Sequence, residues 1–169
     1  DQQQTDVVLR LADCYFMQKE FGKAMPLYNQ VAGKRGFGAD YAMFQIAMIQ
    51  GAQNKPADKI NTLKSVDNLF ANSSMNGLVN MEIADTYLSD EKFKEALPFL
   101  QKIIFGKNNE SLKPPAYLKS GLAYYNLDNF SEALKAFKTL LKQYPQSQES
   151  EEAIDNVRSI YVEQGNPDG

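Results

Sequence analysis

The chain has 169 residues, of which 43% are hydrophobic and 23% charged, a balance that is typical of a folded globular protein and excludes a disordered one. Its net charge of −3 provides no basic field for binding nucleic acid, and no apolar run approaches the roughly 20 residues that cross a bilayer. Histidine is absent and Cys14 is the single cysteine, which excludes an intrachain disulfide and zinc sites built from Cys and His.

The first 33 residues predict a pair of helices, over 5–18 and 21–33. Val8, Leu11 and Tyr15 recur at the i, i+3, i+7 spacing that gives a helix one apolar face. A short polar turn separates the two helices, so we expect them to pack against each other as a hairpin.

The residue spacing of this first pair returns twice further along the chain, with intervals of 6, 3 and 4 residues each time. The three sets are Tyr15, Phe21, Ala24 and Tyr28; Tyr87, Phe93, Ala96 and Leu100; and Tyr124, Phe130, Ala133 and Phe137. A small residue stands three positions before each leading tyrosine, at Ala12, Ala84 and Gly121. Such recurrence indicates an internal repeat.

A fourth, degenerate copy fills the gap between the first two sets. Ala47 lies 35 residues after Ala12 and 37 before Ala84, and Gly121 lies 37 after Ala84. The aromatic and alanine positions of this copy hold Gln50, Pro56 and Lys59, and its last position holds Leu63. The small residues of all four copies are expected to let the neighbouring helix approach closely.

The remaining predicted helices follow in pairs, with one helix left over at the end. They span 38–53, 56–71, 74–88, 92–105, 115–127, 130–144 and 148–164. Asn129 and Glu132 resemble a capping pair at the start of one of them. We therefore predict one all-α domain over 1–169, with repeats near 5–36, 38–72, 74–108 and 114–147 and a terminal helix, 148–164, that caps the stack.

The repeated residues resemble the tetratricopeptide repeat family, whose pattern is a small residue, an aromatic three later, a turn aromatic, an alanine, another large residue and a terminal proline. The fourth copy matches best, with Gly121, Tyr124, Phe130, Ala133, Phe137 and Pro145. The resemblance implies a right-handed α-α superhelix in which the first helix of each pair lines a concave groove. The second copy departs from the pattern.

Carried over to this chain, the resemblance puts ten residues along a partner-binding groove. They are Asp13, Phe16, Met17, Tyr41, Phe44, Met48, Met81, Asp85, Leu122 and Tyr125. Any one of them can instead be a packing residue. Relatives that clamp a terminal carboxylate use Lys and Asn where this chain has Leu9, Asp13, Gln45, Leu78 and Glu82. We therefore expect a hydrophobic or basic peptide rather than an acidic tail.

The functional prediction is a non-enzymatic scaffold that binds a protein or peptide segment, with no cofactor, no metal and no insertion of this segment into a membrane. The missing histidine removes the commonest general base, and Asp13 and Asp85, the remaining acid–base candidates, lie two repeats apart. Two alternatives stay open: a structural, self-associating segment that forms a homo-oligomer, and an enzyme with paired carboxylates. Cys14 is predicted to be a small buried packing residue.

The segment from Tyr144 to Ser147, followed by Glu149 to Ala153, resembles the linker between repeats of bacterial envelope members of the family. This resemblance favours the bacterial periplasm or cell envelope over the cytoplasm. The chain begins with Asp1 rather than Met, and we expect it to be part of a longer protein.

Overall fold

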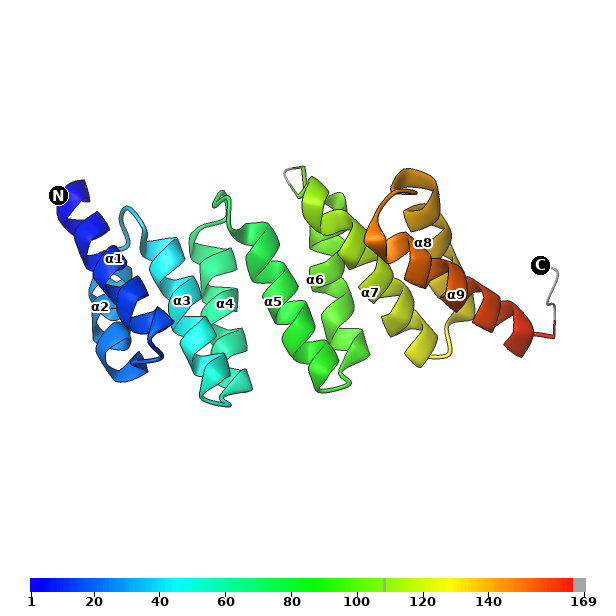
Figure 1. Ribbon diagram of the computed structural model, residues 1–169, viewed down its shortest axis with the longest axis horizontal. Coiled ribbons are helices and arrows are strands. Elements are labelled where there is room, and N and C mark those ends of the chain that lie inside the picture. Colours follow the sequence, from blue (N-terminus) through cyan, green and yellow to red (C-terminus); the bar gives the residue numbers. More distant parts are fainter. Residues whose placement is uncertain (108, 166–169) are drawn as a thin grey trace. The chain divides into compact units, whose positions relative to one another are not determined.

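The computed structural model describes residues 1–107 and 109–165, which form nine α-helices and one short 3-10 helix without a strand (Figure 1). The helices are α1 (Gln2–Met17), α2 (Phe21–Gly33), α3 (Ala39–Ala52), α4 (Pro56–Leu69), α5 (Asn76–Ser89), α6 (Phe93–Phe105), η1 (Glu110–Leu112), α7 (Lys113–Asn126), α8 (Phe130–Gln143) and α9 (Gln148–Glu163). The predicted all-α fold is confirmed, and the observed helix ends differ from the predicted ones by at most three residues.

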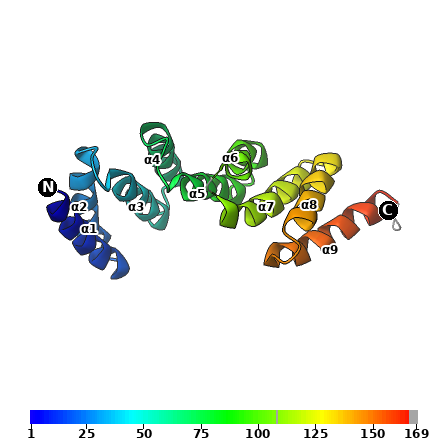
Figure 2. The same cartoon turned by 90° about the horizontal axis from the view of Figure 1, so that it is seen from above.

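The chain divides into two compact units, whose boundary falls between Val79 and Asn80, inside α5. In unit 1, α1 packs against α2, α2 against α3, and α3 against α4. In unit 2, α7 packs against α6, α8 and α9. Figures 1 and 2 show these neighbours side by side within each unit.

Small and large residues alternate at the contact between the two helices of each repeat, as the spacing predicts. The small residues Ala12, Ala47, Ala84 and Gly121 are all buried. The large residues that follow 16 positions later, Tyr28, Leu63, Leu100 and Phe137, have no exposed surface. A Cβ added to Gly121 would lie 2.6 Å from Cδ1 and Cζ of Phe137, so the glycine makes room for the phenylalanine ring.

A left-handed residue recurs in the turn between the two helices of every repeat. It is Lys19, Asn54, Glu91 or Asp128, each with φ between 56° and 59°. The next residue donates its N–H, at 2.9 Å in each repeat, to the carbonyl of Tyr15, Gln50, Tyr87 or Tyr124. The degenerate second repeat therefore keeps the main-chain turn although it has lost the aromatic side chains.

One side-chain contact shows what replaces the lost tyrosine of the second repeat, and another confirms a sequence prediction. Gln50, which replaces the tyrosine in the second repeat, accepts a hydrogen bond from the Thr62 hydroxyl at 2.8 Å and so links α3 to α4. The predicted cap at the start of α8 is confirmed, because the Asn129 side chain accepts from the Glu132 N–H at 3.4 Å.

The prediction that Cys14 is buried is wrong, because the cysteine is exposed. Val7 and Leu11, two turns and one turn earlier on α1, are also exposed, by 64% and 46%. These three residues share one face of α1 that no described helix covers, and the local sequence gives no sign of that.

We expect Glu91→Gly to stabilise the protein by about 0.5–1 kcal/mol. An L-residue in the left-handed region strains the backbone by roughly 1–2 kcal/mol, and glycine avoids this strain but loses more entropy on folding. Glu91→Ala keeps the strain and should give no such gain. Urea denaturation of the three proteins measures the difference, and a glycine variant no more stable than the alanine variant would contradict the expectation.

Candidate protein-binding surface

Three helices of unit 1 meet at the carboxylate of Asp13. Its Oδ1 accepts hydrogen bonds from the hydroxyls of Tyr28 on α2, at 2.6 Å, and Tyr41 on α3, at 2.9 Å. The Gln45 amide donates in turn to the Tyr41 hydroxyl at 2.7 Å. This network joins α1 to α2 and to α3.

The surroundings of the two phenols keep them protonated. Burial, reinforced by the hydrogen bond to Asp13, raises the pKa of Tyr28 far above its usual range. Burial also raises the pKa of Tyr41, opposed by the hydrogen bond from Gln45 and supported by the one to Asp13. Both hydroxyls therefore remain donors to the carboxylate over the whole physiological pH range.

The other predicted groove residues of unit 1 differ widely in exposure. Met17, at the end of α1, is 80% exposed. Phe16 is half-buried, and its ring packs against that of Phe21 with centroids 5.7 Å apart. Phe44 and Met48 on α3 are partly exposed. Together with Tyr41 they leave a partly accessible apolar strip on the first helices of unit 1.

In unit 2, the predicted residues Asp85, Leu122 and Tyr125 lie at the surface or close to it. Asp85 on α5 forms an ion pair with Lys119 on α7. Leu122 is partly buried against the core around Phe137. Tyr125 donates its hydroxyl to the carboxylate of Glu163 on α9.

Met81 is 9% exposed and belongs to the core of unit 2, where it packs with Ala84 and Leu100. A side chain buried in this way is not available to a partner. We therefore leave Met81 out of the surface proposed below.

Sequence reasoning missed an acidic recess of about 580 Å³ between α7 and α9. Its lining residues are Pro115, Leu118, Lys119, Gln148, Glu149, Glu151, Glu152 and Asp155. Four carboxylates thus face one ammonium group, and that group, on Lys119, is already paired with Asp85. The sequence shows these acidic residues only as a run near the start of a helix, and it is the packing of α9 beside α7 that makes them a wall of the recess.

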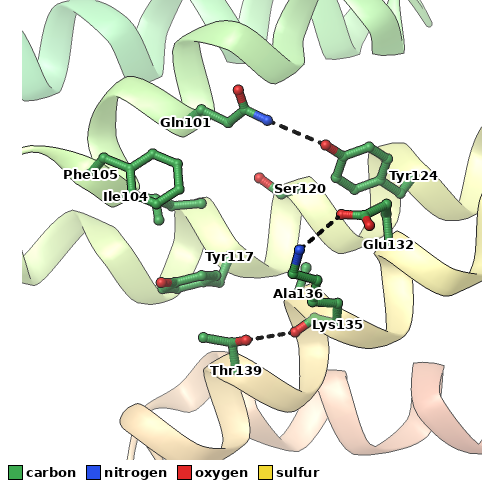
Figure 3. A pocket seen from close by; sticks show the side chains of 10 residues that line it. All are labelled: Gln101, Ile104, Phe105, Tyr117, Ser120, Tyr124, Glu132, Lys135, Ala136 and Thr139. Carbon is green, nitrogen blue, oxygen red and sulfur yellow. Dashed lines mark hydrogen bonds and ion pairs between the residues drawn. The ribbon is translucent and has the colours of Figure 1, made fainter.

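A second pocket, of about 310 Å³, lies between α6, α7 and α8 (Figure 3). Its lining residues are Gln101, Ile104, Phe105, Tyr117, Ser120, Tyr124, Glu132, Lys135, Ala136 and Thr139. No local motif points to it, because its lining residues come from helices of two successive repeats.

Within residues 1–107 and 109–165, no three His, Cys, Asp or Glu side chains are grouped so that they could hold a metal ion. A search of the same residues for a helix of sufficient length and apolarity to traverse a lipid bilayer found none.

Comparison with solved structures supports the fold at low sequence identity. A crystal structure of the protein MamA is similar to this chain with a TM-score of 0.74 at 18% sequence identity, and the match covers 97% of this chain and 84% of that one. A MamA fragment from Desulfovibrio magneticus RS-1 has a TM-score of 0.72 at 14% sequence identity, and the match covers 96% of this chain and 86% of the fragment. A tetratricopeptide repeat protein from Parabacteroides merdae ATCC 43184 has a TM-score of 0.79 at 13% sequence identity, and the match covers 98% of this chain and 63% of that protein. These likenesses establish the fold alone.

Sequence comparison gives a more specific result. A search of curated proteins finds no match. Residues 6–34 and 115–147 match the sequence profile described as Tetratricopeptide repeat, and these segments lie within the first and fourth repeats identified from residue spacing. The matched segments, the four equivalent turns and the small–large contacts agree with one another, so the chain has the fold of tetratricopeptide repeat proteins, and its first and fourth repeats match that family's profile.

Proposed function

We propose that this chain binds a protein or peptide segment on the faces of its first helices, and that the acidic recess between α7 and α9 receives a basic side chain of the partner. Repeat proteins of this kind use their stacked helices as extended binding surfaces for other proteins. The excess of carboxylates in the recess is the observation that carries the proposal.

The charges of the recess favour a cation. Glu149 and Glu151 lie in the first turn of α9, where the helix dipole stabilises negative charge. Lys119 is the single cation among the lining residues and is paired with Asp85, and Asp155 is paired with Arg158 on α9 at 3.5 Å. The negative charge of Glu149, Glu151 and Glu152 therefore carries the preference for a cation. A Lys or Arg side chain entering the recess would pair with these carboxylates, whereas an acidic segment would be repelled.

The apolar strip of unit 1 supports the same function through a different contact. Met17, Phe44 and Met48 offer flexible or aromatic surface to an apolar side chain. A segment that combines basic and apolar residues is therefore the proposed ligand class, in agreement with the absence of the Lys and Asn residues that clamp carboxylates in other family members.

The test compares two labelled peptides, one with Lys and Leu and one with Glu and Leu in the same positions, by fluorescence anisotropy. The basic peptide should bind more tightly, and Glu151→Gln with Glu152→Gln should weaken it by about fivefold. The matched control, Asp58→Asn with Glu95→Gln, removes two charges from α4 and α6, outside the recess, and should change the affinity little. Added salt should weaken binding to the unaltered chain.

Equal affinity for the two peptides, or equal loss in both double variants, would contradict the proposal. The solution mass measured over a concentration series accompanies this test, because self-association is the alternative. That alternative is favoured by Ile154 and Val162, which are 41% and 65% exposed on α9. A mass that rises with concentration, without peptide binding, would favour it.

A further inference from the structure

The pocket between α6, α7 and α8 has walls that fit an aromatic ring. Ile104, Phe105, Tyr117 and Ala136 supply apolar surface from all three helices. Phe105, at the end of α6, is 82% exposed. The volume of about 310 Å³ can hold one large side chain.

The hydroxyl of Ser120 lacks a hydrogen-bond partner inside this pocket. Ser120 is only 3% exposed, and its Oγ has no donor or acceptor within reach. Figure 3 shows the hydroxyl directed into the space that Gln101, Ile104 and Tyr117 surround. A serine on a helix commonly bonds the carbonyl one turn earlier, as Thr139 does with Lys135, but Ser120 does not. A buried hydroxyl without a partner is unfavourable, and a ligand that supplies one relieves this.

The polar groups that line the pocket favour an uncharged ligand. The only charged lining residues, Glu132 and Lys135, form an ion pair with each other at 3.7 Å. Gln101 donates to the Tyr124 hydroxyl at 3.3 Å, so these two uncharged polar groups bond to each other. A charged ligand would find no free counter-charge here, so the pocket favours an uncharged group with an apolar body and one polar tip.

We propose that this pocket binds a tyrosine side chain of a partner polypeptide, with the ring between Ile104, Phe105 and Tyr117 and the phenol hydroxyl bonded to Ser120 Oγ. Tyrosine combines a large rigid apolar body with a hydroxyl that can both donate and accept. The site is formed by both second helices, α6 and α8, together with α7. It is therefore separate from the recess between α7 and α9, and its test does not depend on that recess.

The experiment uses the whole chain and two soluble probes, N-acetyl-tyrosinamide and N-acetyl-phenylalaninamide, which differ by one hydroxyl. Titrations followed by amide chemical shifts should show changes at Gln101, Ser120 and Ala136. The tyrosine probe should bind about fivefold more tightly than the phenylalanine probe, the effect of one hydrogen bond. In Ser120→Ala this ratio should fall to about one.

Two variants keep the result interpretable. Ser120→Ala removes an unpaired buried hydroxyl, so its thermal midpoint should be unchanged or higher, and loss of discrimination will not reflect unfolding. Ser159→Ala removes an exposed hydroxyl on α9 that is bonded to the Asp155 carbonyl, and it should keep the fivefold ratio. Equal binding of the two probes to the unaltered chain, discrimination that survives in Ser120→Ala, or shifts confined to other residues would each overturn the proposal.

Discussion

Gly121→Ala is expected to destabilise the protein by about 1–3 kcal/mol, although alanine favours helices more than glycine does. The added Cβ would lie 2.6 Å from two atoms of the Phe137 ring, closer than carbon atoms approach in packed proteins. Both residues are buried, so the ring cannot move aside without disturbing Leu140 and Ala153 in the same core cluster. Chemical denaturation of the variant measures this loss.

A second substitution should restore much of that stability. Repeats two and three pair alanine with leucine at the same two positions, as Ala47 with Leu63 and Ala84 with Leu100. Gly121→Ala with Phe137→Leu would copy that arrangement into repeat four and conserve its volume. The double variant should therefore be more stable than the sum of the single effects predicts, by about 1–2 kcal/mol. Additive losses would mean that these two side chains do not limit each other.

Asp13→Ala should destabilise the protein by about 2–3 kcal/mol. It leaves the hydroxyl of Tyr28, which has no exposed surface, without its acceptor, and hydrogen bonds to charged groups are among the stronger ones. Asp13→Asn keeps an acceptor oxygen and should lose less. If Tyr28→Phe is introduced first, Asp13→Ala should have a smaller effect, and denaturation of the four proteins tests this coupling. Equal losses in both backgrounds would contradict it.

The same network predicts how stability changes in alkali. The folded chain holds the pKa of Tyr28 above the value of about 10 that a free phenol has in the unfolded chain. The stability that Tyr28 contributes through this raised pKa is fully present below pH 10. It is lost as the pH rises further, because the unfolded state then releases a proton that the folded state retains. The free energy of unfolding should fall less steeply above pH 10 in Tyr28→Phe than in the unaltered chain.

The spacing of residues was enough to predict the helix pairs, because the same side chains recur wherever two helices must approach. Ala12 and Tyr28 occupy the same kinds of environment as Ala84 and Leu100, and this environment is visible as a period in the sequence. The left-handed turn was not predictable in this way. Lys19, Asn54, Glu91 and Asp128 have different side chains, and only the backbone that they share makes them equivalent.

The recess and the pocket of unit 2 could not be predicted from the sequence, for another reason. A pocket depends on side chains from several helices, and each of them is unremarkable alone. In the sequence, Ser120 is an ordinary small polar residue on a predicted helix. Only the structure, which places it beside Ile104 and Tyr117, shows that its hydroxyl is buried without a hydrogen-bond partner. The groove prediction for Asp13 and Tyr41 brought together two residues that do meet, but it did not foresee that Tyr28 joins them.

The fixed geometry of the turn limits where the chain can change in length. From the small residue to the large one is 16 residues in every repeat: 12 to 28, 47 to 63, 84 to 100 and 121 to 137. From that large residue to the next small one is 19, 21 and 21 residues, so all of the variation lies there. The length difference between repeats thus falls in the segment that leads from the second helix of one repeat to the first helix of the next, and the part that holds the hairpin contact keeps a constant length.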